Sequence, residues 1–568
     1  MARWRPLIVL SVMQFLMVLD TSVMNVSISQ LVADFDTTVS SIQAVITLYS
    51  LVMAALMIAG GKVGDIVGRR RVLVIGLMLF AAGSALTTVS WSVASLALGW
   101  SVLEGIGAAL VLPAMAALIA GNYRGGDRVT AYGVMGGTAG AAIALGPIVG
   151  GWITTQYSWR AVFGAEVVVA LGVILASRVV VDSPRPTARP KLDIVGALLT
   201  AVGLTAIVGG LLMSSTWGWL TPVNSPIQPF GYALTPFVVC VGLAILYVFV
   251  LWEARRERLG LDPLVRLRLF RIHPLKSGLT TLLSMNVVFM GVFFILPLYL
   301  QIFLGLNAFE TGLRLLPMSL VMFVVSFCGG PLLYVLSPRS IIRISLFVMV
   351  LATLLLLVTV EPTFRERDFV LSMALMGAGM GLMASQLGNV ILSSVGPESR
   401  SEAGGLQYTA QQLGGALGVA LIGSIVMTGL ASTYINQLGR NSDIPPATTQ
   451  SVEVDLSNGV KFVPGTQAAT AVAAAGFTGA VADQLVATYE EAQLQSLKSG
   501  LLAAAGVAAL SFLVTGGLPT RRLDDLAAEQ GDDGRGPDLD RAQPPAESGE
   551  GIDSDLGNPI SDLNRGTR

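Results

Sequence analysis

Three acidic residues, Asp20, Glu104 and Glu166, stand inside long apolar runs of the sequence, where ionisable groups are rare. No Lys or Arg lies deep in any of these runs to pair with them. A charged side chain at the centre of a bilayer costs at least about 2.5–3.5 kcal/mol on insertion scales, so an acid at this depth is a candidate functional group. A low-dielectric environment favours the neutral form of an unpaired carboxyl group. Such a group could take up a proton from one side of a membrane and release it to the other.

The three acids differ in their expected depth. Asp20 lies deepest, and we expect it to carry a coupled proton. Glu104 lies near the middle of its run and is expected either to carry a proton or to recognise the charge of a ligand. For Glu104 the alternative is a protonated acid that donates to a backbone carbonyl. Glu166 is expected close to the outer surface, where a structural hydrogen bond competes with a proton-coupling role.

Other residues in the apolar runs could line a cavity for a lipophilic molecule. Met and Phe side chains adapt to varied apolar shapes, and sparse amides could orient a ligand among them. Simple packing of the Met residues is the alternative to a binding role. The candidates for this cavity are Met24, Asn25, Asn286, Phe289, Met290, Met380, Gln386, Asn389 and Gln411.

The elements that must position these residues are membrane-spanning helices. Hydrophobic residues make up 53% and charged residues 12% of the 568 residues, and a soluble globule of this size needs about twice that charged share. A spanning helix needs about 20 mostly apolar residues. Fourteen runs qualify, at 7–29, 42–62, 72–90, 94–118, 129–152, 162–181, 193–214, 233–252, 278–303, 312–335, 342–360, 369–394, 404–430 and 498–517.

The distribution of basic residues predicts the orientation of these helices. Most Lys and Arg fall in segments on one side, above all in Arg69–Arg71, 178–191 and 255–276. Short cytoplasmic loops carry an excess of Lys and Arg, so this side is expected to face the cytoplasm. With an even number of spans, both termini are expected there as well. We expect a multi-pass protein of the cytoplasmic membrane, and the excess of Arg over Lys suggests a bacterium with a GC-rich genome.

Two long segments are expected to lie outside the membrane. The segment 431–497 is expected to be an external insert, with a hairpin turning at Asn458-Gly459. A polar, Ala-rich helix is expected at about 467–498, leading into the last span. The tail 518–568 is acidic and contains scattered Pro and Gly, which predicts disorder.

Several classes of protein are excluded by what the sequence lacks. The single His, His273, stands in a basic loop, so neither a zinc protease helix nor a Ser-His-Asp triad is expected. The Gly61-Lys62 pair is followed by Val63 rather than Ser or Thr, so it is not a P-loop. The net charge of −1 gives no indication of nucleic-acid binding. We therefore expect no enzyme activity, no cofactor and no metal site.

A glycine-containing basic loop follows the second run. It contains Gly61, Asp65, Gly68, Arg69 and Arg70. The glycines let helices approach closely, and the carboxylate can cap a neighbouring helix or pair with an arginine. The alternative is a basic loop that only sets topology.

A second glycine motif lies within the fifth run. It consists of Gly146, Pro147, Gly150 and Gly151. Gly and Pro in a span produce a close-packed, bendable helix, in which neighbouring groups satisfy the freed backbone atoms.

Together these motifs resemble those of the major facilitator superfamily. The loop 61–71 is similar to the signature loop of that family, and 146–151 to its antiporter motif. Residues 19–26, LDTSVMNV, resemble the first-span motif of the fourteen-span drug:proton antiporter branch. The resemblance covers roughly 7–430 and 498–517. It implies an all-α polytopic fold of two six-helix bundles with two inserted helices, working by alternating access.

This resemblance implies a division of the chain. Residues 1–181 would form the N-terminal six-helix bundle, and 182–277 the two inserted spans with a basic cytoplasmic loop. Residues 278–517 would form the C-terminal bundle, which carries the insert 431–497, and 518–568 the tail. A decayed copy of the signature loop at 330–339 supports two related halves.

The sequence departs from the family pattern at the acidic positions. Ser101 stands where the family usually has Arg, and Glu104 where it usually has Gln. Glu166 replaces the usual Asn, and Gln411 stands where many relatives have Arg. The family's Arg is thought to assist proton coupling, so the standard coupling scheme does not carry over directly.

The leading hypothesis is proton-coupled efflux of amphipathic or lipophilic compounds such as drugs. On this hypothesis the partners are a small lipophilic substrate, protons and the lipid bilayer, and the loop around Asp65 is a gate. An exporter of a lipid or cell-envelope component is the alternative, because the altered motif of the fourth span, with Ser101 and Glu104, and the long insert would suit a specialised substrate. A transport-inactive sensor or scaffold is a third class, against which the intact Asp20 and glycine motifs argue.

Overall fold

The computed structural model describes residues 4–123, 126–182, 191–222, 224–333, 335–396, 399–440 and 462–520. These residues form helices and connecting turns, with no strand in the described ranges. Among them, 14 helical segments are long and apolar enough to cross a membrane. The prediction of an all-α polytopic fold with fourteen spans is therefore confirmed. The predicted hairpin at Asn458-Gly459 and most of the tail lie outside the described residues.

The helices of the first part of the chain begin at polar caps and run through apolar stretches. Thr38 accepts a hydrogen bond from Ser41 N (3.2 Å), and Ser158 accepts one from Arg160 N (3.2 Å), each at the start of a helix. Their bounds are α1 (Arg5–Val26), α2 (Ile28–Asp34), α3 (Val39–Val67), α4 (Arg69–Thr88), α5 (Val93–Leu96), the π-helix η2 (Ala97–Glu104), α6 (Gly105–Asn122), α7 (Gly126–Gln156) and α8 (Trp159–Ala176).

The remaining helices follow a similar pattern of length and spacing. The inserted pair is α9 (Ile194–Trp217) and α10 (Thr235–Arg258). The last group comprises α11 (His273–Pro297), the π-helix η6 (Leu298–Phe303), α12 (Ala308–Leu332), α13 (Pro338–Thr359), α14 (Glu366–Ser393), α15 (Arg400–Arg440), α17 (Gly465–Ala474) and α18 (Ala480–Val514). Short 3₁₀ turns lie at Ser177–Val179, Pro229–Gly231, Leu267–Arg271 and Thr515–Gly517.

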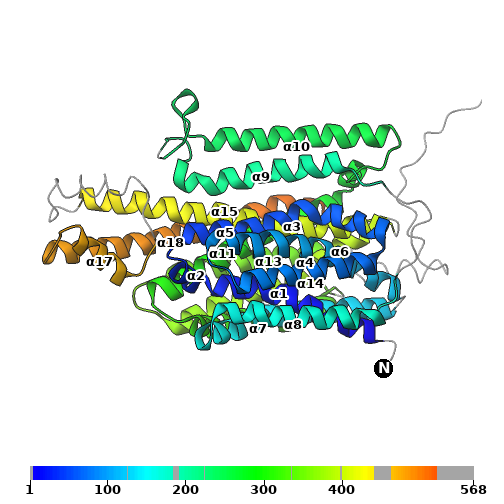
Figure 1. Cartoon of the computed structure of the whole chain (residues 1–568), viewed down its shortest axis with the longest axis horizontal. Coiled ribbons are helices and arrows are strands. Elements are labelled where there is room, and N and C mark those ends of the chain that lie inside the picture. Colours follow the sequence, from blue (N-terminus) through cyan, green and yellow to red (C-terminus); the bar gives the residue numbers. More distant parts are fainter. Residues whose placement is uncertain are drawn as a thin grey trace, which may run out of the picture. The chain divides into compact units, whose positions relative to one another are not determined.

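We call α1–α8 the first group of helices and α11–α18 the second, and helices contact one another both within each group and between the groups. In the first group α1 lies against α7, and α4 lies against α6 and α8; in the second, α12 lies against α14, and α11 against α15. The seams between the groups are α3 with α15 and α7 with α12. Figure 1 shows α9 and α10 running side by side along the flank formed by α3 and α15.

The fourth span is not a uniform α-helix. Residues Ala97–Glu104 form a π-helical stretch, whose wider turn shifts the direction of the side chains that follow it. Two glycines allow this stretch to approach α4 closely. A Cβ at Gly83 would lie 2.6 Å from Gly99 O, and one at Gly99 would lie 2.7 Å from Thr87 Oγ1. Glu104 is thereby brought against α4.

A polar clamp fixes the start of α8. Trp159 Nε1 donates to Asp34 Oδ2 (2.8 Å), Arg160 Nη1 lies 2.9 Å from the same oxygen, and Arg160 Nη2 donates to Ser90 O (3.1 Å). Partial burial acts to raise the pKa of Asp34, but hydrogen bonds from Gln30, Trp159 and Arg160 and the charge of Arg160 lower it below its ordinary value. The clamp ties α8 to α2 and to the turn after α4.

The prediction of one continuous helix at about 467–498 is wrong, because this segment forms two helices. The chain forms α17 first and then breaks, because Gly476 and Gly479 adopt positive φ of 88° and 66°. From Ala480 a single helix continues through the last span to Val514. At the other end of the insert, α15 extends to Arg440, beyond the predicted end of its span at 430.

The close approach at Gly83 can be tested by adding one methyl group. A Cβ there would lie 2.5 Å from Glu104 Cγ, so Gly83→Ala must displace Glu104 or separate α4 from η2. We expect a loss of about 1–3 kcal/mol of stability, as for other overpacked sites. Gly136→Ala is the matched control, because nothing lies within 4 Å of its Cβ position. Thermal unfolding of the purified variants measures both, and equal melting temperatures would contradict this packing.

The Asp34 clamp predicts a pH-dependent contribution to stability. The folded-state pKa is lowered, so the carboxylate stabilises the fold above its unfolded pKa of about 3.9. This contribution is lost as the pH falls through the folded value. Asp34→Asn should lower stability at neutral pH by about 0.2–1 kcal/mol, the range for partly exposed pairs. Melting temperatures recorded against pH should converge with those of the wild type below about pH 4; a difference that persists in acid would refute the ion-pair account.

Candidate functional site

The three acids that stand apart in sequence meet in one buried cluster. Asp20 comes from α1, Glu104 from the end of η2 and Glu166 from α8, and we call them the acid cluster. Each contributes one carboxylate oxygen to a group in which all three oxygens lie within 4.8 Å of one another. Asp20 and Glu104 are 0% exposed and Glu166 is 2% exposed. Glu166, which was expected nearest to the outer surface of the membrane, is buried beside the other two acids.

Neutral donors hold one oxygen of each carboxylate. Trp100 Nε1 donates to Asp20 Oδ1 (2.7 Å), and Thr87 Oγ1 donates to Glu104 Oε1 (3.3 Å). Ser84 Oγ reaches Glu166 Oε2 at 3.5 Å, the longest of these contacts. Among the described residues, no Lys, Arg or His forms an ion pair with the cluster, and the second oxygen of each carboxylate has no hydrogen-bond partner.

A rigid aromatic pair closes the cluster on one side. The rings of Tyr49 and Trp100 stack with centroids 4.4 Å apart and planes inclined by 7°. Tyr49 is 1% exposed, and its hydroxyl faces the Asp20 carboxylate without a hydrogen bond of normal geometry within the described part of the chain. Ser101, at the family's Arg position, donates to Val45 O (2.7 Å) and supplies no charge.

The antiporter motif holds α7 between two other helices. A Cβ at Gly146 would lie 2.5 Å from Ser22 Cβ, and one at Gly150 would collide with Val23, so both glycines face α1 just beyond Asp20. On the other side, Gly151 contacts the backbone of α12 at Ala308, and Pro147 O contacts Gly312. The motif is therefore the place where the helix carrying Asp20 is linked, through α7, to the second group of helices.

The predicted gating loop forms a small charged cap. Gly68 adopts φ 113° between α3 and α4, a conformation that favours glycine, while Gly61 lies against Pro113. Arg69 Nη2 lies 3.0 Å from Asp65 Oδ1, and Arg69 Nη1 donates to Ala117 O (3.2 Å). A partly exposed ion pair of this kind contributes about 0.2–1 kcal/mol, so its contribution to overall stability is small.

Next to this loop, Arg70 N donates to Asp182 Oδ1 (3.2 Å) and connects the start of α4 to the chain after α8. We call the end of the helices that carries Arg69, Arg70 and Arg256 the basic end. The described residues of the predicted gating loop thus lie together at this end.

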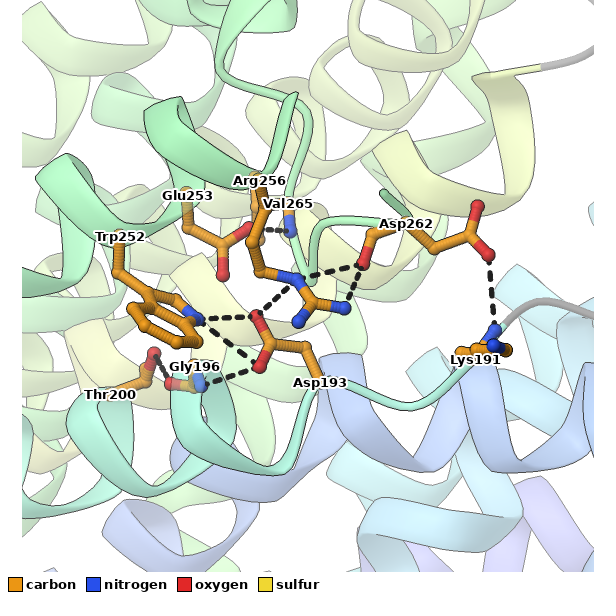
Figure 2. A network of polar contacts seen from close by, with 9 residues as sticks. All are labelled: Lys191, Asp193, Gly196, Thr200, Trp252, Glu253, Arg256, Asp262 and Val265. Carbon is orange, nitrogen blue, oxygen red and sulfur yellow. Dashed lines mark hydrogen bonds and ion pairs between the residues drawn. The ribbon is translucent and has the colours of Figure 1, made fainter. Parts of the chain in front are cut away.

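A second polar network at the basic end fastens the inserted helices (Figure 2). Asp193 caps α9 at Gly196 N (3.0 Å), accepts from Trp252 Nε1 (2.9 Å) and pairs with Arg256 (3.2 Å). Buried Glu253 accepts from Val265 N (3.0 Å) in the segment after α10.

This network continues toward both groups of helices. Arg266 N donates to Glu402 Oε1 (2.6 Å) in the first turn of α15. Lys62, near the end of α3, lies within electrostatic range of Glu402, Glu253 and Asp193. The inserted pair is thus connected at the basic end to the seam between α3 and α15.

At the end opposite to the basic end, hydrogen bonds join the two groups of helices directly. Gln301 Nε2 of η6 donates to Val26 O (2.7 Å), and Ser29 also contacts Gln301. Phe309 N donates to Thr155 Oγ1 (3.3 Å). These contacts join the two groups of helices at that end.

The nine predicted cavity residues are spread over four helices. Met24, Asn25, Asn286, Met380 and Gln386 are buried; Phe289, Met290 and Gln411 are half-buried and Asn389 is exposed. Two amides are occupied by their own helices: Asn25 Nδ2 donates to Thr21 O and Asn286 Nδ2 to Leu282 O. A separate apolar groove of about 550 Å³ lies along α1 and α7 and is lined by none of the nine. Their role in binding stays a prediction.

Several residues of the site were missed by the sequence reasoning. Tyr49, Ser84, Thr87 and Trp100 are polar or amphipathic groups inside spans, and Ser84 and Thr87 are three residues apart on one helix. That spacing puts them on one face of α4 and could have marked it as the face toward a buried acid. The partners in α1, η2 and α8 are too distant in sequence for any local pattern to join them.

Comparison with known proteins agrees with this architecture. Residues 10–419 match the model of the Major Facilitator Superfamily. The chain is 31% identical over 430 residues to the probable actinorhodin transporter of Streptomyces coelicolor, covering 74% of this chain and 72% of that protein. It is 30% identical to the puromycin resistance protein pur8 of Streptomyces alboniger, in a match that covers 83% of this chain and 90% of that protein. It is 26% identical to the multidrug efflux pump LfrA of Mycolicibacterium smegmatis, in a match that covers 82% of this chain and 89% of that protein.

Solved structures share the fold at low sequence identity. A bacterial homolog of the human lysosomal transporter Spinster, inward-facing and unoccupied, has a TM-score of 0.57 at 16% identity, over 91% of this chain and 98% of that one. A D-xylose–proton symporter has a TM-score of 0.53 at 14% identity, and the match covers 74% of this chain and 90% of that one. The chain therefore belongs to the Major Facilitator Superfamily and is a multi-pass membrane transporter rather than an enzyme.

Proposed function

We propose that this transporter exports amphipathic or lipophilic compounds, antibiotics among them, across the cytoplasmic membrane in exchange for protons. The observation that carries this proposal is the acid cluster, three buried carboxyl groups with neutral donors and no basic partner among the described residues. The names of relatives, a multidrug efflux pump and antibiotic resistance and export proteins, support a drug-like substrate over a lipid or envelope component.

The chemistry of the acid cluster suits proton exchange. Three carboxylates held this close together in a dry environment repel one another, so neutral carboxylic acids are favoured at rest. Opening toward the other side admits water, which stabilises the ionised form and lets a proton leave. Trp100, Thr87 and Ser84 donate to the carboxyl oxygens and keep the ionised groups in position. Asp20, Glu104 and Glu166 are the groups that we assign to coupling.

Movement of the helices can reach this cluster through the antiporter motif. Gly146 and Gly150 pack α7 onto the turn of α1 that follows Asp20, while Gly151 and Pro147 contact α12. Rocking of one group of helices against the other would therefore change the contacts around Asp20. At the basic end, which we assign to the cytoplasm by its charge, the Asp65–Arg69 pair acts as a gate.

The proposal is tested with protein reconstituted in liposomes under an imposed proton gradient. We expect wild-type protein to move a lipophilic fluorescent drug against its concentration gradient. Asp20→Asn keeps size and polarity but cannot exchange a proton, so gradient-driven transport should fall to background while drug binding remains. Glu104→Gln should also impair transport, because Glu104 belongs to the cluster. Proton release on drug addition in detergent is the second readout.

The matched control is Glu366→Gln, which removes an exposed carboxylate at the start of α14 and should transport like the wild type. Full proton release from Asp20→Asn would reject Asp20 as a coupling group. Wild-type behaviour of Glu104→Gln would reduce Glu104 to a packing residue.

A further inference from the structure

We propose that the acid cluster and Tyr49 together form a binding site for Na⁺, which enters in place of one proton. This inference rests on the proposed function, because it concerns the same carboxyl groups and names a second ion that they exchange. The coupling ion of this transporter would then be either H⁺ or Na⁺ at a single site.

The spacing of the oxygens is that of ligands around a cation. One oxygen each of Asp20, Glu104 and Glu166 lies within 4.8 Å of the other two. A hard cation such as Ca²⁺, which is close to Na⁺ in size, lies about 2.3–2.6 Å from its oxygen ligands. Oxygens on opposite sides of such an ion are therefore separated by about twice that distance. Oxygens no farther apart than 4.8 Å are close enough to coordinate one such ion together.

Each carboxyl group of the acid cluster has one oxygen without a hydrogen-bond partner of normal geometry among the described residues. These buried oxygens are Asp20 Oδ2, Glu104 Oε2 and Glu166 Oε1. Buried polar atoms normally have a partner, so three orphans in one cluster indicate a bound species that supplies the missing contacts. The opposite oxygens are already held by Trp100 and by the hydroxyls of α4.

Tyr49 provides an independent ligand. Its hydroxyl is buried, faces Asp20 and has no hydrogen-bond partner of normal geometry in the described ranges. The stack on Trp100, 4.4 Å between centroids, fixes the ring and therefore the position of its oxygen. A phenol oxygen is neutral, so it adds coordination without adding to the negative charge of the site. Hard oxygen donors of this kind suit alkali and alkaline-earth cations rather than softer transition metals.

Charge balance favours exchange of one Na⁺ for one proton. With three carboxylic acids protonated the cluster is neutral. When Na⁺ binds, one carboxyl group loses its proton to water and the other two keep theirs, so the cluster remains neutral. A divalent cation would require the loss of two protons, and a dry site with three carboxylates would release it slowly. An ion that takes part in a transport cycle must bind weakly enough to leave.

The test uses the full-length protein in detergent with little buffer. Addition of NaCl should release protons in a saturable way, approaching one per protein, whereas choline chloride at equal ionic strength should release none. Na⁺ should also raise the melting temperature, as any ligand that binds only the folded state does. Glu366→Gln, remote from the cluster, should respond like the wild type.

Tyr49→Phe keeps the aromatic stack and removes only the oxygen, so it separates metal coordination from protonation. We expect the Na⁺ concentration for half-maximal proton release to rise about tenfold or more, as when groups that support a metal site are removed. Wild-type Na⁺ affinity in Tyr49→Phe would remove Tyr49 from the site. Release by CaCl₂ but not by NaCl would overturn the assignment to Na⁺.

The outcomes separate this inference from the proposed function. Proton release on drug addition without any on NaCl addition overturns the Na⁺ site and leaves drug:proton exchange standing. If neither drug nor NaCl releases protons, both the drug:proton exchange and the Na⁺ site are overturned.

Discussion

The burial of three carboxyl groups in one apolar cluster is the constraint on which the rest of this structure depends. Asp20, Glu104 and Glu166 have no basic partner among the described residues, so their charge must be removed by protonation or balanced by a bound cation. The scaffold accommodates them with neutral donors, a π-helical turn before Glu104 and the close approach at Gly83. Each of these features is unfavourable or unusual in isolation, and together they hold the acids within reach of one another.

On the proposed function, coupling between this cluster and the two ends of the protein would run through packed helices rather than through long-range charge. The glycines of α7 contact α1 on one face and α12 on the other, so a shift of the second group of helices would reach the turn beyond Asp20. The end at Gln301 is joined by hydrogen bonds between the groups, while the basic end carries the Asp65–Arg69 pair and the network around Asp193. The inserted helices α9 and α10 belong to this network, which connects them to the first turn of α15 through Arg266.

Hydropathy was enough to predict the fourteen spans, and the resemblance of 19–26, 61–71 and 146–151 to known motifs was enough to indicate the family, because each is a local property of the sequence. The convergence of the acids was not predictable, since it depends on which faces of α1, η2 and α8 turn toward each other. Glu166 shows the difference: its position in its run gave no sign that its side chain would be buried beside Asp20 and Glu104. The break at Gly476 and Gly479 was missed because an Ala-rich segment has a strong helix propensity that two positive-φ glycines override.

We propose above all that the acid cluster holds protons at rest and gives one up when the transporter binds its substrate. Infrared difference spectroscopy of the reconstituted protein measures this directly, because protonated carboxyl groups absorb apart from carboxylates. The account predicts that addition of a transported drug removes intensity from the carboxylic-acid band, and that this change is absent when Asp20, Glu104 and Glu166 are replaced together by their amides. A drug-induced loss of equal size in that triple variant, or an unchanged band in the wild type with drug bound, would contradict it.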